Sequence, residues 1–420
     1  MTTTRDAVDT DGTGYRDSPY PVLAAMRAAA PVSLLHTEEG LPVWLVTGYH
    51  EVRAALADPR IRQDGIRAQA LADERVPGVD VGAGIVHMLN SDPPDHTRLR
   101  QVMTGSFTAA RVAALRPAVA RVVDDLLDAI EVADRAGGGG VEVDLVGAYA
   151  FPLPLTVICA LLGVPAADRA TFRDWSTALV THDEPGAAAV ATAQMRGYLT
   201  ELLAEKRAAP ADDILTDLLR AHDDGRLSHD EVLSMAILLL IAGHETTVSL
   251  IGNATLLLLR DPARLAEVRA DPSRLPAAID ELLRLESPVA MATMRFTTAP
   301  VRIGEVELPA GEFVLLSIGA ANRDPARFAD PDRMDPFRAP GHLAFGHGMH
   351  RCLGAALARM EGKVALGRLL ARFPQLALAG DDGLRWRDTP MLRGLESLPV
   401  TVTRRRGRRP GAEAPGESPG

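Results

Sequence analysis

The chain has 420 residues, of which 47% are hydrophobic, so it can bury a large core. Its formal net charge of -10 argues against nucleic-acid binding by the whole protein, because phosphate contacts require a basic face. Its two cysteines, Cys159 and Cys352, cannot form a disulfide framework, and the first residues lack the apolar run of a signal peptide, so we expect a cytoplasmic protein.

The pattern of elements predicts one mainly helical domain with a small β-sheet region over residues 18–403. Strands are predicted at residues 31–34, 41–46 and 301–320, the last block with a hairpin at its Pro-Ala-Gly turn, and helices at 49–57, 109–132, 229–260, 262–272 and 275–285. No internal repeat or long linker interrupts this domain. Residues 1–17 are predicted to be a disordered arm, and the Arg, Pro and Gly-rich residues 404–420 a disordered tail.

The most apolar predicted helix begins at a capping box, in which Ser228 and Glu231 stand three residues apart. It continues for about 32 residues, or ~48 Å at the helical rise, which is enough to cross the molecule. A membrane span would require about 20 largely uncharged apolar residues. His244, Glu245 and Asn253 interrupt this segment, so a buried core helix is expected and no membrane association.

The centre of this helix reads AGHETT, residues 242–247, and contains three residues that are unfavourable in the middle of a core helix. Gly243 costs about 1 kcal/mol relative to Ala, and a buried Glu245 must be paired, hydrogen-bonded or neutralised. In a functional interpretation Gly243 lets a flat ligand approach while Glu245 and Thr246 deliver protons. In a structural interpretation Thr246 bonds back to a carbonyl and Glu245 reaches a buried arginine. The motif alone favours neither.

Two further motifs follow. Glu281 and Arg284 share a helical face and can pair, which is weak evidence alone because such pairs are common. The stretch FGHGMHRCLG, residues 345–354, sets Cys352 before an apolar helix, where the first-turn N–H groups favour a thiolate. This thiol could be a small buried hydrophobe, a nucleophile with His350 or His347 as its base, or a metal ligand. Zinc would require three further ligands that the chain does not offer, whereas haem iron needs one.

The positions of Phe345, Gly348, Cys352 and Gly354 resemble the haem-ligand loop of the cytochrome P450 family, Phe-x-x-Gly-x-x-x-Cys-x-Gly. AGHETT is similar to the oxygen-activating motif of that family, and Glu281-x-x-Arg284 to its ExxR motif. The three motifs occur in the order of the family, and the resemblance covers about residues 20–403.

The resemblance implies a single-domain cytochrome P450 fold in which the long central helix crosses a haem b. Cys352 would ligate the iron, Glu245 and Thr246 would deliver protons, and Arg338 would join Glu281 and Arg284 in a structural cluster. Ala242 and Gly243 would leave room over the ring, Gly348 and Gly354 would let the loop approach it, and Phe345 would shield the sulfur. The haem propionates would bind His96 and Arg100, from SDPPDHTRLR, together with Arg295 and His350.

The implied reaction is insertion of one oxygen atom from O2 into a C–H or C=C bond of a hydrophobic small molecule, such as a secondary metabolite. Electrons would come from a ferredoxin and its reductase, for which Arg98, Arg100 and Arg351 are a candidate docking face, although a propionate or structural role is open for each. The implied substrate pocket contains Met88, Ile241, Thr246, Val289, Ala290, Ala292, Met391 and Leu392. Two alternatives are oxidative coupling or ring closure without oxygen insertion, and a catalytically silent recruitment module.

Overall fold

A computed structural model describes residues 13–81, 86–137, 140–180, 186–339, 341–380, 383–389 and 391–403. The helices are α1 (Thr13–Asp17), α2 (Pro19–Ala29), α3 (Tyr49–Ala57), α4 (Gly65–Arg75), α5 (Asp95–Thr104), α6 (Ala109–Gly137), α7 (Pro152–Leu162), α8 (Arg169–Val180), α9 (Ala187–Ala208), α10 (Ile214–Asp223), α11 (His229–Arg260), α12 (Pro262–Ala270), α13 (Leu275–Leu285), α14 (Ile318–Ala321) and α15 (Ala355–Arg372). The strands are β1 (Val32–His36), β2 (Pro42–Val46), β3 (Ile61–Arg62), β4 (Val141–Asp144), β5 (Arg295–Thr297), β6 (Val301–Ile303), β7 (Val306–Leu308), β8 (Phe313–Leu316), β9 (Ala377–Leu378) and β10 (Pro399–Val402).

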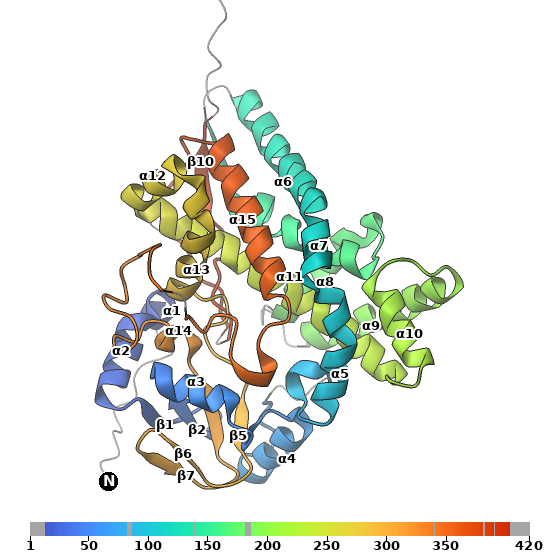
Figure 1. Ribbon diagram of the computed structural model, residues 1–420, viewed down its shortest axis with the longest axis vertical. Helices are drawn as coiled ribbons and strands as arrows, with labels where there is room; N and C mark the ends of the chain where they lie inside the picture. The colour runs from blue at the N-terminus through green and yellow to red at the C-terminus, as the bar shows by residue number, and fades with distance from the viewer. Residues whose placement is uncertain are drawn as a thin grey trace, which may run out of the picture.

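The strands form small sheets beside a larger body of helices, as the sequence predicts (Figure 1). The main sheet has the order β1-β2-β8-β5-β3, in which only β2 and β8 pair in parallel. A second sheet has the order β4-β10-β9, and β6 pairs with β7. In Figure 1 the main sheet lies at the lower left with α3 beside it, whereas α6, α11 and α15 lie above and to the right. The chain therefore folds as one mainly helical domain with small sheets.

The structure corrects two sequence predictions. The hairpin in the strand block at 301–320 turns at Gly304, whose φ of 57° favours glycine, whereas the Pro-Ala-Gly turn at 309–311 connects β7 to β8. After that turn β8 leaves the hairpin and pairs with β2 and β5 instead. Residues 13–17, predicted as part of a disordered arm, form α1, while residues 1–12 and the predicted tail 404–420 lie outside the described residues.

Helix α11 forms with the predicted bounds because its capping box is complete. The side chain of Ser228 accepts from the N–H of Glu231 at 3.1 Å, and Glu231 accepts from the N–H of Ser228 at 2.7 Å. Within the described part of the chain this helix is long and apolar enough to cross a membrane, but 78% of its most apolar 18 residues are buried. Its hydrophobic side chains belong to the largest core cluster, so packing inside the protein accounts for its composition.

The cluster of Glu281, Arg284 and Arg338 fixes the irregular segment that leads to Cys352. Arg284 on α13 is 2% exposed and donates to both carboxylate oxygens of Glu281, at 2.7 and 2.8 Å. Arg338 donates to Glu281 Oε1 at 3.0 Å, as the sequence resemblance implied. Arg284 also donates to the carbonyls of Asn322, Pro331 and Arg333. The two guanidinium groups therefore replace the backbone ladder that this segment lacks.

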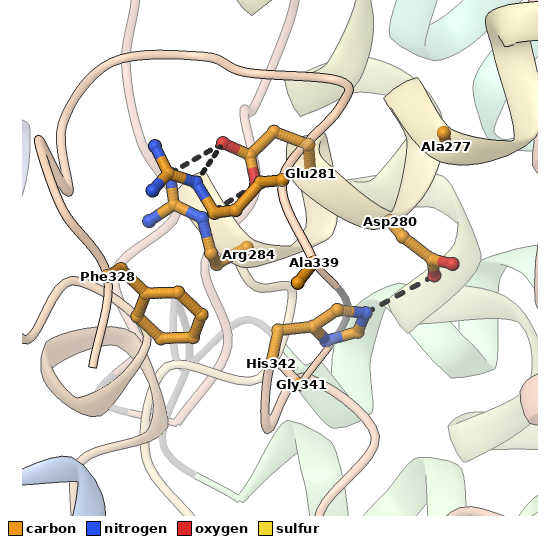
Figure 2. A pocket seen from close by; sticks show the side chains of 9 residues that line it. Ala277, Asp280, Glu281, Arg284, Phe328, Ala339, Gly341 and His342 are labelled. Carbon is orange, nitrogen blue, oxygen red and sulfur yellow. Dashed lines mark hydrogen bonds and ion pairs between the residues drawn. The ribbon is translucent and has the colours of Figure 1, made fainter.

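A cavity of about 150 Å³ adjoins this cluster (Figure 2). Figure 2 shows Glu281 and Arg284 paired on one side, while the neighbouring Asp280 points toward His342. Asp280 Oδ1 lies 3.2 Å from His342 Nε2 and accepts from Arg359 of α15 at 2.7 Å. Successive acidic residues on α13 therefore hold two different parts of the path toward Cys352.

We predict that Glu281→Gln lowers the free energy of unfolding by about 3–5 kcal/mol, because it leaves the buried Arg284 charge without its counter-ion. The matched control is Glu305→Gln. It removes a similar i,i+3 pair, between Glu305 and Arg302. Because the side chains of Arg302 and Glu305 are 59% and 94% exposed, this change should alter stability by no more than about 0.5 kcal/mol. Urea unfolding of both variants measures the difference, and equal losses would contradict the structural role of the cluster.

Candidate functional site

The middle of α11 is uncovered on one side. All residues from Val232 to Leu240 are buried, and so are most from His244 onward, but Ala242 is exposed and Ile241, Gly243 and Thr246 are half-buried. Apolar side chains in the centre of a core helix are normally covered by neighbours. This uncovered stretch coincides with the AGHETT motif and marks one wall of the candidate site.

Gly243 has a different role from the expected one. A Cβ at this position would lie 2.9 Å from Ile158 Cδ1 on α7, which is too close for a real contact. The missing side chain therefore lets α7 pack tightly on α11, and does not leave room over a ring. The preceding residue, Ala242, is exposed and borders the uncovered side of α11.

Glu245 and Thr246 make the two contacts of the structural interpretation. The hydroxyl of Thr246 donates to the carbonyl of Ala242 at 2.9 Å, and the carboxylate of Glu245 forms an ion pair with Arg387. Glu245 is 1% exposed, whereas Thr246 is half-buried on the uncovered side. Burial acts to raise the pKa of Glu245, but the hydrogen bond and charge of His244 and the charge of Arg387 outweigh it, so this pKa is lowered.

The loop that carries Cys352 is shaped by glycine. Gly346 and Gly348 have φ values of 69° and 74°, and the N–H of Cys352 donates to the carbonyl of Phe345 at 2.8 Å. A Cβ on Gly348 would lie 2.6 Å from the carbonyl oxygen of Leu56 in α3, so this glycine seats the loop against α3. Gly354 has no such constraint, because its Cβ would meet only Cys352 Sγ, at 4.0 Å.

The position of Cys352 differs from the prediction. The residue precedes α15, which begins at Ala355 with Gly354 as its N-cap, so the sulfur is not in the first helical turn. The thiol is accessible but surrounded by protein atoms. Burial raises its pKa, while the N–H of Gly354 and the charges of Arg100, Arg351 and Arg359 act to lower it. The groups that act to lower this pKa are therefore one backbone N–H and three arginines, and not the N–H groups of a first helical turn.

Four basic residues that are far apart in the sequence converge beside this loop. The rings of His96 on α5 and His350 have centroids 4.2 Å apart, and Arg100 donates to the carbonyl of Arg351 at 2.7 Å. Three buried nitrogens of this group have no hydrogen-bond partner: His96 Nε2, His350 Nε2 and Arg295 Nε. Buried polar groups without partners are rare in folded proteins. We call His96, Arg100, Arg295 and His350 the cationic cradle.

Burial lowers the pKa values of all four groups in the cationic cradle. Arg295 is 4% exposed, and burial lowers its pKa to about 10 against the opposing effect of Asp92. Burial, with the charges of His96, Arg295 and Arg100, lowers the pKa of His350 to about 2. Arg295 is therefore a buried cation, which requires a partner such as a carboxylate, whereas His350 is neutral and keeps a buried ring nitrogen without a partner. The donors fit the two propionates of a haem, and Cys352 beside them fits its iron ligand.

Phe345 lies within a contact that the sequence did not predict. The guanidinium of Arg359 lies over its ring at 4.3 Å from the centroid, and Asp280 holds Arg359 from the other side. The ring is half-buried in the loop before Cys352. Arg359 and Asp280 therefore position the aromatic side chain that was expected to shield the sulfur.

The structure brings together two of the predicted substrate segments. The N–H of Ala290 donates to the carbonyl of Met391 at 2.8 Å, and Val289 pairs with Leu392 in an isolated antiparallel bridge. Ile241 is on the uncovered side of α11, and Met88 lies half-buried in a short 3-10 turn. Ala292 differs, because its side chain is 8% exposed within the core cluster packed on the main sheet.

Arg98 is part of the capping of α11 and not a free docking group. It donates to both carboxylate oxygens of Glu231, at 2.6 and 3.1 Å, and to Asp95 at 2.8 Å. Arg351 is exposed, and Arg100 points toward the Cys352 loop. Of the three arginines in the candidate docking face, Arg351 is exposed, whereas Arg98, whose side chain is 38% exposed, is engaged in ion pairs.

Sequence reasoning missed the residues that enclose Glu245. Arg387 comes from an irregular C-terminal segment and Ser176 from α8, and neither lies in a recognisable motif. The available signal was the need of a buried carboxylate for a cation. That need indicates an arginine, but with 43 arginines and only two lysines in the chain it does not say which one.

Comparisons with known proteins agree with this geometry. The family model "Cytochrome P450" matches residues 186–392. Cytochrome P450 107B1 of Saccharopolyspora erythraea is 52% identical over 379 residues, covering 88% of this chain and 92% of that protein. Cytochrome P450 monooxygenase PikC of Streptomyces venezuelae is 46% identical over 407 residues, 95% of each chain. The structure of the tirandamycin C-bound P450 monooxygenase TamI matches with a TM-score of 0.86 at 46% identity, covering 93% of this chain and 99% of that one.

We predict that Gly348→Ala destabilises the protein by about 1–3 kcal/mol, because it forces a Cβ into a left-handed conformation and against the Leu56 carbonyl. Gly354→Ala is the control and should change stability by less than about 1 kcal/mol, since its φ of -80° suits any residue and its Cβ meets no backbone. Urea unfolding measures both. A loss with Gly354→Ala as large as that with Gly348→Ala would contradict the seating of the loop on α3.

Proposed function

The chain belongs to the cytochrome P450 family, and we propose that it is a haem-thiolate monooxygenase that inserts one oxygen atom from O2 into a C–H or C=C bond of a hydrophobic secondary metabolite. The observation that carries this proposal is the cationic cradle, whose unpartnered buried nitrogens lie beside an accessible cysteine. A merely structural cluster would satisfy these groups with acidic side chains or carbonyls.

The Cys352 loop and the cationic cradle would together hold a haem b. Cys352 would ligate the iron, and His96, Arg100, Arg295 and His350 would bind the propionates. When bound, the haem supplies the cleavage of the O–O bond of dioxygen, which thiolate ligation favours. Burial raises the pKa of Cys352, but the N–H of Gly354 and the charges of Arg100, Arg351 and Arg359 act against this rise and would stabilise the thiolate that the iron requires.

Oxygen activation needs protons, for which we assign Glu245 and Thr246. The Thr246 hydroxyl donates to the Ala242 carbonyl, so the lone pairs of its oxygen remain available to a water or an incoming proton donor on the uncovered side of α11. Glu245 is the acid next to it in the sequence. The carboxylate can supply a proton only when its side chain leaves the buried ion pair with Arg387.

The substrate pocket is apolar at the residues assigned to it. Ile241, Val289, Ala290, Met391 and Leu392 offer hydrocarbon surface and no charge. Members of this family take hydrophobic substrates together with O2 and receive electrons from redox partners. TamI, with tirandamycin C bound, supports a natural product as the class of substrate for this chain.

We assign the electrons to a small ferredoxin and its reductase in the cytoplasm. The loop that carries Cys352 offers Arg351 and Met349 as exposed side chains, the latter 36% exposed. A cation beside an exposed apolar side chain suits the acidic surface of a small electron carrier. Both cysteines of the chain are free, which agrees with a reducing compartment.

We predict that the reduced, CO-bound protein shows the strongly red-shifted Soret band of a thiolate-ligated haem, and that Cys352→Ser and Cys352→His abolish it. Cys159→Ser is the control, because Cys159 is fully buried in the core and should leave the band in place. Absorption spectra of the four reconstituted proteins test this. A red-shifted band that survives in Cys352→Ser would overturn the ligand assignment, and failure of the wild-type protein to bind haem would favour a silent recruitment module.

We also predict that Thr246→Ala raises the peroxide released per electron pair consumed about tenfold, because a proton is then no longer held at the Thr246 oxygen. Thr247→Ala is the control, since its hydroxyl lies on the buried side of α11 and is 3.4 Å from the Gly243 carbonyl. Peroxide is measured against NADPH consumption with a surrogate ferredoxin system. Unchanged release in Thr246→Ala would remove Thr246 from its role.

When a substrate is found, labelled dioxygen will distinguish oxygen insertion from oxidative coupling. One labelled atom in the product is expected for a monooxygenase. A product that forms at full rate with no label would favour coupling or ring closure.

A further inference from the structure

Arg359 of α15 is held between two groups beside the Cys352 loop. Its guanidinium lies over the ring of Phe345 at 4.3 Å from the centroid, and its Nε donates to Asp280 Oδ1 of α13 at 2.7 Å. The side chains of Arg359 and Asp280 are 36% and 32% exposed. Simultaneous contact with an aromatic face and a carboxylate fixes the position of a long side chain. Arg359 is therefore a positioned cation, and not a freely moving surface group.

The carboxylate of Asp280 is itself fixed by His342. His342 Nδ1 accepts from the N–H of Ala344 at 3.2 Å, so the hydrogen-bond network assigns the ring proton to Nε2. His342 Nε2 lies 3.2 Å from Asp280 Oδ1 and therefore donates to it. Figure 2 shows Asp280 pointing toward His342, whose side chain is 6% exposed. One carboxylate oxygen thus accepts from both His342 and Arg359.

The backbone on both sides of His342 is fixed as well. The carbonyl of Gly341 accepts from the hydroxyl of Tyr49 on α3 at 2.5 Å. The N–H of Leu343 donates to Asn322 Oδ1 at 2.6 Å. The histidine that donates to the carboxylate therefore has a rigid support. As a result, both the carboxylate and the cation bonded to it have defined positions.

The charge of Arg359 acts on Cys352. The carbonyl of Phe345, the residue under the guanidinium, accepts from the N–H of Cys352 at 2.8 Å. Burial raises the pKa of Cys352, and the charge of Arg359 acts against this rise. Arg100 and Arg351 act in the same direction, but Arg100 belongs to the cationic cradle, where a propionate would pair with it, and Arg351 is exposed. Arg359 is therefore the cation of the three that the protein itself holds beside the Cys352 loop.

A fixed charge beside the iron ligand changes how readily the iron is reduced. One electron from the ferredoxin converts ferric to ferrous iron and lowers the net charge of the iron and its thiolate by one. A nearby cation makes this step more favourable and a nearby anion makes it less favourable. The charge in contact with the Cys352 loop is that of Arg359, and Asp280 opposes it.

We propose that Arg359 is a positioning residue of the haem site, whose charge raises the reduction potential of the haem and whose contact with Phe345 keeps that ring beside Cys352. Asp280, held by His342, limits the effect of this charge. The pair of Arg359 and Asp280 thereby sets how readily the iron accepts an electron from its carrier. The inference rests on the proposed role of Cys352 as the iron ligand.

The first test measures the reduction potential of the haem in the loaded protein without substrate, by spectroelectrochemistry. Arg359→Gln should shift the potential to lower values, because it removes the cation and keeps a polar side chain. Arg359→Lys keeps the charge and should restore most of the wild-type potential. Asp280→Asn removes the opposing charge and should shift the potential to higher values. In the double variant Arg359→Gln with Asp280→Asn the two shifts should largely cancel.

Arg372→Gln is the matched control on the same helix. The side chain of Arg372 is 33% exposed and forms ion pairs with Asp128 and Glu131. It lies ~20 Å further along α15 at the helical rise, where salt screens its charge, so this variant should leave the potential unchanged. An unchanged potential in Arg359→Gln, or shifts of the same sign in Arg359→Gln and Asp280→Asn, would overturn the proposal. A fall in Arg372→Gln as large as that in Arg359→Gln would do so as well.

The CO-bound spectrum tests the contact with Phe345. Arg359→Gln should increase several-fold the rate at which the red-shifted band is replaced by an unshifted one, because the ring beside Cys352 is no longer held. Phe345→Leu should give a similar increase, and the double variant little more, since the two residues act together. A wild-type rate in Arg359→Gln, or fully additive increases in the double variant, would overturn the role of this contact.

The same measurements separate this inference from the proposed function. If the wild-type protein shows no red-shifted band, Cys352 is not the iron ligand and the proposed function fails. If the wild-type band is present while Arg359→Gln changes neither the potential nor the lifetime of the band, the proposed function stands and this inference alone is refuted.

Discussion

The buried ion cluster of Glu281, Arg284 and Arg338 is the constraint on which the site depends. Between α14 and α15 the described residues are largely irregular, with one short 3-10 turn at Gly348–His350, so backbone ladders fix little of their path. The guanidiniums of Arg284 and Arg338 donate to carbonyls along this segment, and the side chain of Asn322 accepts from the N–H of Leu343 at 2.6 Å. The bond between Asn322 and Leu343 is buried, where a hydrogen bond is stronger than at the surface. Together these bonds determine where the Cys352 loop begins.

The Cys352 loop and the cationic cradle lie together because residues from several elements converge at this place. α5 supplies His96 and Arg100, the start of β5 supplies Arg295, and the loop itself supplies His350. The cluster is unfavourable without an anion, as its unpartnered nitrogens show. This is a common cost of ligand sites: groups that bind a charged cofactor remain poorly satisfied until it is present.

The acid and the alcohol of AGHETT illustrate how one motif can satisfy structure and chemistry together. The contacts of the structural interpretation are present, with Thr246 bonded to Ala242 and Glu245 paired with Arg387. They do not exclude the functional interpretation, because a buried carboxylate must be paired in any resting state.

The sequence determined the elements whose information is local. The capping box at Ser228 and the apolar spacing after it defined α11, and α3 and α13 also have their predicted bounds. The resemblance to the motifs of the family pointed to Cys352 and to the basic residues of the cationic cradle. Only the tertiary structure decided that Gly243 faces Ile158, that Ala292 is in the core and that Arg387 holds Glu245. These contacts join residues up to 142 positions apart, and they are set by the packing of α7 and of the segment around Arg387 on α11, which no local pattern encodes.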